Sequence, residues 1–270
     1  MRVYILITQE HINFYIEKIP PMPKTLKVTM QLLQESELLK ASQIAKTDKA
    51  LSSYLKELVN KPIYGFKNEV QDIAQIFGIL GVIKSQQVVY NYMVSLLSPS
   101  QWNFFQLNKT TFYTFQADLS VGWQKILAHL GIKDREFEAT ITLLPASVIV
   151  SEALFCEKKE DITLLKSVKE INLNTILQRL CNQTLFDICE TIAKKWDMEA
   201  KTIALLHASS GIKPANDPMC NTLGKWMHLF LFYTLSKPIY IEAGLNDFIE
   251  FNIDYVEDIY EDFALLMEVA

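Results

Sequence analysis

The sequence predicts an all-α protein, built as a helical bundle of about twelve helices. Apolar residues recur at positions i, i+4 and i+7 in nearly every segment, which is the spacing of one helix face. The 270 residues include only eight glycines and nine prolines, and half of them are hydrophobic, so the chain can bury a sizeable core. No internal repeat and no long linker divides the sequence.

The first half of the chain carries six apolar stripes at helical spacing. Pro23 precedes the second stripe and suits the first position of a helix. Asp48 is the expected N-cap of the third, because its carboxylate can accept hydrogen bonds from free backbone N–H groups. Gly81, Pro99 and Gly131 are the expected ends of the last three. The stripes consist of Ile12, Ile16 and Ile19; Leu26, Met30 and Leu33; Leu51, Leu55 and Leu58; Ile73, Ile76, Phe77 and Leu80; Val82, Val89, Met93 and Leu96; and Phe112, Phe115, Leu119, Ile126 and Leu130.

The second half continues the helical pattern. Asp134 can cap the next helix, and Pro145 is expected to kink or break it. Gly211 is expected to stop a later helix, and the segment GIKPANDPMCN after it has the composition of a loop. The opening segment MRVYILI is expected to be extended or helical. The remaining stripes consist of Phe137, Ile141 and Leu144; Leu185, Ile188, Cys189 and Ile192; Ile203, Leu206 and Ser210; and two helices near 223–235 and 254–267.

The composition argues against several classes of protein. The formal net charge is −5 and the lysines are not clustered, so we expect no nucleic-acid partner. The longest strongly apolar stretch, residues 226–235, is about half the length of a transmembrane helix, so we expect no insertion into a membrane. The start of the chain lacks the features of a signal peptide. The four cysteines form no CxxC pair, and in a cytoplasmic protein they are expected to be reduced thiols.

The common catalytic and nucleotide-binding motifs are missing from the sequence. There is no GxxxxGKS/T, GxGxxG, GxSxG or HExxH, and none of the four histidines is followed by an aspartate. Helical metal-dependent phosphohydrolases use such a His-Asp pair to hold hard cations beside a phosphate. We therefore expect no enzymatic activity, no metal and no cofactor. His11 and His129 are expected at helix ends or on polar surfaces, and His228 in the core with a hydrogen bond to backbone.

A set of turn and helix residues recurs in a characteristic order between residues 19 and 82. A proline-rich turn is followed by an Asp-x-Ala-Leu helix start, by an Asn-x-x-x-Tyr-Gly segment, and by a helix that closes with Leu-Gly. This segment resembles the start of the HD-related output domain, HDOD. The resembling positions can all be explained as scaffold: the prolines prepare a helix, Asp48 caps, Asn60 and Gly65 can adopt the left-handed conformation, and Gly81 permits a tight stop. They are Pro21, Pro23, Asp48, Asn60, Tyr64, Gly65, Leu80 and Gly81.

The resemblance continues more weakly to the end of the chain, and it implies a degenerate HD motif. Where HD proteins have Leu-Leu-His-Asp-Ile-Gly, this sequence has Leu-Leu-Pro-Ala-Ser-Val, so Pro145 and Ala146 replace the metal-binding pair. His207 matches the first histidine of a His-His pair, and alanine replaces the second. The implied organisation is an N-terminal extension, 1–18, and an HDOD-like domain, 19–270. That domain comprises an N-terminal helical subdomain, 19–100, and an HD-like helical core, 101–270.

The family resemblance implies a stand-alone bacterial module of signal transduction, which acts as a non-catalytic output or adaptor through contacts with other proteins. Its partners would be signalling proteins of unknown identity, and the sequence does not indicate the oligomeric state. Two alternatives are a sensor that binds a nucleotide or other small molecule, and a residual metal-dependent phosphohydrolase. The sensor would use the pocket vacated by the metal site, near Pro145, Ala146, Ser147 and His207.

Charge is unevenly distributed along the chain. After Lys237 the sequence has nine acidic residues and no lysine or arginine, whereas the part up to Lys237 has 26 basic and 22 acidic residues. On the expected last helix, Val256, Ile259, Phe263 and Leu266 would face the core. The opposite side is either a solvated helix face or a surface that steers a basic partner or the protein's own lysine-bearing N-terminal half. Its acidic residues are Glu257, Asp258, Glu261 and Asp262.

Overall fold

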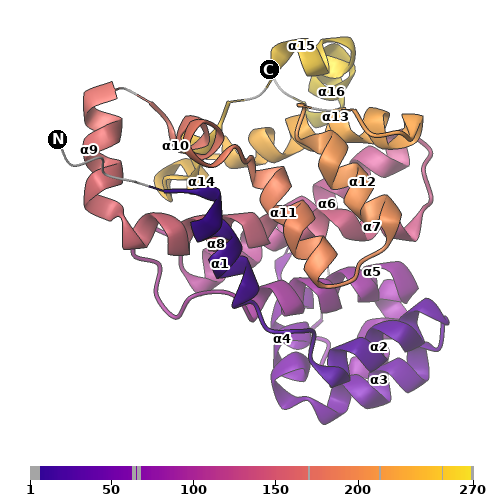
Figure 1. Ribbon diagram of the computed structural model, residues 1–270. Coiled ribbons are helices and arrows are strands. Elements are labelled where there is room, and N and C mark those ends of the chain that lie inside the picture. Colours follow the sequence, from indigo (N-terminus) through magenta and orange to yellow (C-terminus); the bar gives the residue numbers. More distant parts are fainter. Residues whose placement is uncertain are drawn as a thin grey trace.

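The structure is a computed structural model that describes residues 7–62, 65, 68–169, 171–212, 214–250 and 252–268. All regular secondary structure in these residues is helical, so the predicted fold class is confirmed (Figure 1). The buried apolar side chains form one cluster that extends from Ile7 to Met267. Tyr64, which belongs to the predicted scaffold, and the segment MRVYIL lie outside the described residues.

The N-terminal helices divide between two places in the fold. Helices α2, α3 and α4 pack together with α5 at the bottom of Figure 1, whereas α1 packs against α8 and α11 of the second half. These helices are α1 (Gln9–Glu17), α2 (Lys24–Gln34), α3 (Leu38–Thr47), α4 (Lys49–Val59) and α5 (Ile73–Ser95).

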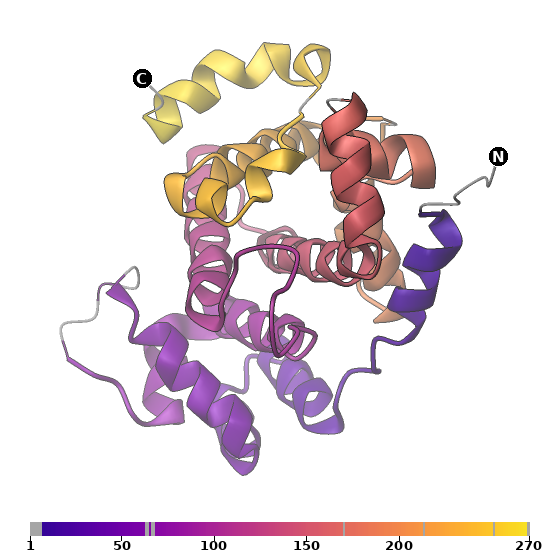
Figure 2. The same cartoon turned by 90° about the vertical axis from the view of Figure 1, so that its left-hand side faces the viewer.

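The second half of the chain forms the larger group of helices. Seen from the side, the yellow C-terminal helices and the group of α2, α3 and α4 lie at opposite ends of the molecule (Figure 2). This half contains α6 (Lys109–His129), α7 (Arg135–Thr140), α8 (Leu144–Glu157), α9 (Lys159–Lys169), α10 (Leu173–Ile176), α11 (Leu185–Lys195), α12 (Ala200–Ser209), α13 (Pro218–Leu235), α14 (Pro238–Glu242), α15 (Ile253–Val256) and α16 (Tyr260–Met267).

Most predicted helix boundaries agree with the structure, and two need correction. Asp48 caps α4 by accepting hydrogen bonds from the N–H groups of Ala50 and Leu51, as predicted. Pro23 is the N-cap of α2 rather than its first residue. Asn60 has φ −82°, so it is not left-handed. Its side-chain amide instead pairs with both backbone groups of Val70, at 2.9 and 3.0 Å, which closes the loop after α4.

The helix is interrupted just before Pro145, where a kink or break was predicted. A 3₁₀ turn, Ile141–Leu143, follows α7 directly, and α8 begins at Leu144 with Pro145 in its first turn. The first backbone N–H groups of a helix have no partner within the helix, so proline costs little at this position. The same residue that would break a helix interior therefore starts α8.

Gly81 interrupts α5 as predicted. Its φ of 71° and ψ of 178° lie in a region that is essentially restricted to glycine. The change of direction leaves Ile76 and Leu80 on the buried side, also as predicted.

Replacing Gly81 with alanine is expected to destabilise the protein by about 1–3 kcal/mol through backbone strain. Gly78 is the matched control, because a Cβ at either glycine would meet no atom within 4 Å and Gly78 does not have the positive φ of Gly81. Gly78→Ala is expected to stabilise by about 0.5–1 kcal/mol. Urea unfolding of the two variants measures both effects, and equal effects would show that the strain at Gly81 is misjudged.

Two helical stretches of the described chain are long and apolar enough to cross a membrane by length and composition. One, Arg135–Glu157, is 89% buried within the fold, and the other, Ile73–Ser95, is 44% buried and broken at Gly81. Both contribute to the common core, as core helices of soluble proteins do.

Candidate functional site

The first turn of α8 occupies the place of the predicted vestigial pocket. Pro145, Ala146 and Ser147 are all buried. The Ser147 hydroxyl donates to the carbonyl of Leu144, and the Cys189 thiol of α11 donates to the carbonyl of Leu143 at 3.3 Å. Helix α11 packs directly against α8, so protein atoms fill this region. The hollows described below are lined by other residues.

His207 does not complete a metal site with these residues. Its Nδ1 lies 3.1 Å from a carboxylate oxygen of Glu190, which also pairs with Lys194. Burial raises the pKa of the nearby Cys189 thiol to about 12, so it is not a thiolate at neutral pH. Across the part of the chain that the structure describes, no three His, Cys, Asp or Glu side chains form a group that could hold a metal ion.

The other histidines have structural partners. His11 accepts a hydrogen bond from the Thr8 N–H at the start of α1, and His129 lies 3.1 Å from a carboxylate oxygen of Asp262. His228 is buried, with Nδ1 2.8 Å from the carbonyl oxygen of Ser209 and Nε2 accepting from the N–H of Asn252. The prediction of a core histidine bound to backbone is confirmed for His228.

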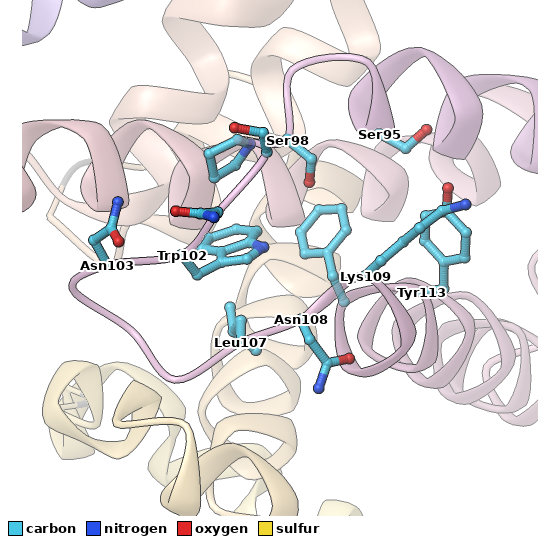
Figure 3. A pocket seen from close by; sticks show the side chains of 12 residues that line it. Ser95, Ser98, Trp102, Asn103, Leu107, Asn108, Lys109 and Tyr113 are labelled. Atoms are coloured by element: carbon cyan, nitrogen blue, oxygen red, sulfur yellow. The ribbon is translucent and has the colours of Figure 1, made fainter.

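One hollow, of about 590 Å³, lies between the end of α5 and the start of α6. Figure 3 shows Lys109 beside Tyr113, and Trp102 on the connecting loop. Lys109 already has a partner, because its Nζ lies 3.3 Å from a carboxylate oxygen of Glu57. The buried Glu152 of α8 binds this loop, because its carboxylate accepts hydrogen bonds from three successive backbone N–H groups of the loop at 2.6–2.9 Å. Hydrogen bonds to Glu152 therefore hold one wall of this hollow, and the lysine in the hollow is already paired with Glu57.

A second concave region lies where α2 and α5 meet α7 and the turn between α11 and α12. It consists of an inner hollow of about 250 Å³ and an outer one of about 480 Å³. We call it the junction groove. The two hollows share Met30, Gln34, Tyr90, Met198 and Glu199, so they are continuous.

The proline-rich turn of the predicted scaffold forms the outer end of the junction groove. Pro21 lines the outer hollow, and the Trp196 indole N–H donates to the carbonyl of Pro20 at 3.4 Å. The turn is thus attached to the second half of the chain. Of the predicted scaffold residues, Pro21 therefore lines the groove where the two groups of helices meet.

The inner hollow contains two polar side chains that the sequence analysis did not single out. Gln86 and Tyr90 are one helical turn apart on α5, between apolar residues of a stripe that was interpreted only as core. The signal that could have identified them is the polar run Ser85-Gln86-Gln87 inside an otherwise apolar helix.

The acidic C-terminal residues lie where the sequence places them, although the last helix is not continuous. A 3₁₀ turn, Glu257–Ile259, separates α15 from α16. Glu257 and Glu261 are exposed and have no ion-pair partner among the described residues. Asp258 pairs with Lys225 of α13 at 2.7 Å, and Asp262 pairs with His129 of α6. Half of this acidic face is therefore used to attach the C-terminal helices.

Comparison with known proteins adds the family. The HDOD domain profile matches residues 19–210, which is more than half of the chain and includes the scaffold residues, the start of α8 and His207. The chain belongs to the HDOD family. No curated protein matches this HDOD chain.

Solved structures of similar fold cover almost the whole HDOD chain. An HDOD domain protein of unknown function from Geobacter sulfurreducens has a TM-score of 0.61 at 12% identity, covering 96% of this chain and 95% of its own. A candidate metal-dependent phosphohydrolase from Shewanella amazonensis has a TM-score of 0.50 at 11% identity, with 96% and 97% covered. A virulence factor from Campylobacter jejuni has a TM-score of 0.43 at 17% identity, with 96% and 99% covered. At these identities the likeness concerns the fold alone.

Proposed function

We propose that this HDOD protein is a non-catalytic regulatory module of cytoplasmic signal transduction, and that it acts through contacts with other proteins. The observation that carries the proposal is the packing of Pro145, Ala146 and Ser147 at the start of α8. These residues offer no imidazole or carboxylate, and α11 covers them. Metal-assisted phosphoester hydrolysis requires side chains of that kind around an open coordination position.

The same packing bears on the two alternatives. A sensor in the vacated metal pocket would need a cavity at the start of α8, where the side chains are instead buried against α11. A residual phosphohydrolase would need His207 as a ligand, but its imidazole is paired with Glu190. Protein contact is supported better, because the fold presents a lined groove and an acidic face on its surface.

The absence of catalysis can be tested directly. The purified protein is expected to hydrolyse neither a phosphodiester nor a phosphomonoester above background with Mn²⁺, Mg²⁺ or Fe²⁺, because the chain lacks the His-Asp pair. His207→Ala is expected to leave that background unchanged. Elemental analysis accompanies the assay. Stoichiometric bound metal together with a turnover that His207→Ala abolishes would contradict the proposal.

The contact function is tested by affinity capture from the native cell extract, followed by identification of the captured proteins. The acidic face supplies a matched pair of variants. Glu257→Gln with Glu261→Gln removes two charges without ion-pair partners, whereas Asp258→Asn with Asp262→Asn removes two that bind within the chain.

Exposed charges raise association rates by steering, and salt screens the effect. If the face steers a basic partner, the glutamate pair of variants slows association at low salt by several-fold, with an unchanged melting temperature. The aspartate pair is expected to lower the melting temperature slightly. Association rates from surface plasmon resonance with the captured partner provide the measurement. Equal association rates with equal salt dependence for wild type and the glutamate variant would show that the acidic face is solvated and does not steer a partner.

A further inference from the structure

A side-chain amide without a hydrogen-bond partner in the described residues lines the inner hollow of the junction groove. Gln86 is only 5% exposed and lines the hollow, yet its side chain makes no hydrogen bond within the described residues. Its neighbour Gln87 shows the usual arrangement, because it donates to the carbonyl of Glu138 and accepts from Gln124. The Gln86 amide lines the hollow, so its donors and acceptor are available to a group from outside the chain.

Tyr90 extends the same surface by one helical turn. Its hydroxyl has no hydrogen-bond partner in the described part of the chain, and the residue lines both hollows. Burial, and then the charges of Glu199 and Glu136, raise the pKa of Tyr90 to about 12, so its hydroxyl remains protonated at neutral pH. Gln86 and Tyr90 together present donors and acceptors side by side, which matches the N–H and C=O groups of a peptide backbone.

The walls of the groove favour an extended, flexible ligand. Met22, Met30 and Met198 come from three separate segments and line its length. Methionine side chains are unbranched and polarizable, and they are common on surfaces that accept varied peptides. The two continuous hollows, of about 250 and 480 Å³, offer room for several consecutive residues of a peptide.

The charges at the inner end of the groove favour a ligand with a basic side chain. Glu136 and Glu199 line the inner hollow, and neither forms an ion pair with a described residue. Burial and Glu199 both raise the pKa of Glu136, against the lowering effect of Lys201. The Nζ of Lys201 lies 2.8 Å from a carboxylate oxygen of Asp134, so this lysine already has an ion-pair partner. Arg135 also lines the inner hollow and donates to the carbonyl of Gln34 and to Ser36 at the end of α2, so two glutamates and one arginine line this end of the groove. The two lysines of the groove, Lys27 and Lys195, line the outer hollow.

We propose that the junction groove binds an extended peptide segment of a partner protein, with a lysine or arginine side chain placed at Glu136 and Glu199 and backbone groups at Gln86 and Tyr90. This inference rests on the proposed function, that the chain acts through protein contacts, and it adds the place and the chemistry of one contact.

The test selects random nonapeptides, displayed on phage, against the immobilised full chain. Enriched peptides are expected to carry a lysine or arginine flanked by apolar residues. The best synthetic peptide is then titrated by fluorescence anisotropy. Binding is expected to weaken at least tenfold in Gln86→Met and in Glu136→Gln with Glu199→Gln, and several-fold in Tyr90→Phe, which removes only the hydroxyl. Gln101→Met, in the hollow of Figure 3, is the control and is expected to bind normally.

Folding is followed in the same variants. Because Gln86 is unpartnered, Gln86→Met is expected to keep or raise the melting temperature while it weakens binding. A large fall in the melting temperature of Gln86→Met would show that Gln86 has a structural role. In that case the titration of Tyr90→Phe would still decide whether peptides occupy the groove. Enrichment of peptides without basic residues, or undiminished binding to all the groove variants, would overturn the inference.

The failure of this inference and the failure of the proposed function have different signatures. A partner captured equally well by wild type and by the Gln86 and Tyr90 variants would show that the protein acts through contacts elsewhere on its surface. Phosphoester hydrolysis with bound metal would instead overturn the proposed function, whatever the peptides do.

Discussion

Replacing Glu152 with alanine is expected to lower the free energy of unfolding by about 3–5 kcal/mol, because three backbone N–H groups would lose their buried acceptor. Glu152 is 3% exposed, and its carboxylate accepts hydrogen bonds from the N–H groups of Asn103, Phe104 and Phe105. Hydrogen bonds to a charged group contribute about 1.5–3 kcal/mol each. Alanine would leave three N–H groups facing a cavity, and the loop that borders the hollow of Figure 3 would open.

Glu152→Gln removes the charge of the side chain but keeps its shape, so it measures the contribution of the charge alone. One amide oxygen can still accept from Asn103 and Phe104, while the amide NH₂ would face the Phe105 N–H, so an intermediate loss is expected. Urea unfolding gives the free energies, and Trp102 fluorescence reports on the loop itself. A loss below about 1 kcal/mol for the alanine variant would mean that water replaces the carboxylate well.

Glu152 also shows which features sequence patterns reveal. Helix caps and stops are local, so Asp48, Asp134 and Gly131 could be identified from neighbours two to four residues away. Glu152 lies 47 to 49 residues from its partners, and the run of apolar residues around it does not indicate that its carboxylate binds that loop. Such contacts depend on how helices pack, which periodicity alone does not determine.

The errors of the sequence analysis have the same origin. Pro145 marks a break as predicted, but the apolar pattern does not show that the break is a 3₁₀ turn after which α8 starts with Pro145 in its first turn. Asn60 was expected to turn the chain through its own backbone, but its amide does so by holding Val70. The family resemblance located the degenerate motif, whereas the unpartnered Gln86 became visible only with the surrounding helices in place.

The stability of the protein is expected to fall by about 3 kcal/mol between pH 7 and pH 4 on account of His228 alone. The carbonyl of Ser209 can only accept, so Nδ1 must carry the proton, and Nε2 accepts from the Asn252 N–H. The neutral ring therefore satisfies both partners. A second proton would meet the Asn252 N–H, and burial lowers the pKa of His228 to about 4.

The direction follows from proton binding in the two states. In the unfolded chain the histidine has its ordinary pKa of about 6.5, so between pH 6.5 and 4 the unfolded state binds more protons than the folded one. Protons therefore favour unfolding in this window. The stabilising effect of the neutral ring is complete above pH 6.5 and is lost progressively as the pH falls towards 4. Below that, His228 contributes no further change.

Urea unfolding of wild type and His228→Gln from pH 7.5 to pH 4 isolates this contribution from that of the other titrating groups. Glutamine also has a donor and an acceptor but does not titrate, so the difference in stability between the two proteins is expected to shrink by about 3 kcal/mol as the pH falls. Parallel profiles would show that the pKa of His228 is the same in the folded and unfolded states.

The first part of the protein to respond to acid is expected to be the segment that contains α15. Asn252 binds His228 through its N–H and the carbonyl of Gly211 through its side chain, and the Tyr255 hydroxyl donates to the carbonyl of Ala208. Protonation of His228 removes the central one of these contacts. Amide exchange protection at Asn252 and Tyr255 is therefore expected to fall before that of α8 as the pH approaches 4, and simultaneous loss would indicate global unfolding instead. Because Glu257 and Glu261 follow directly, the acidic face would lose its fixed position in the same step.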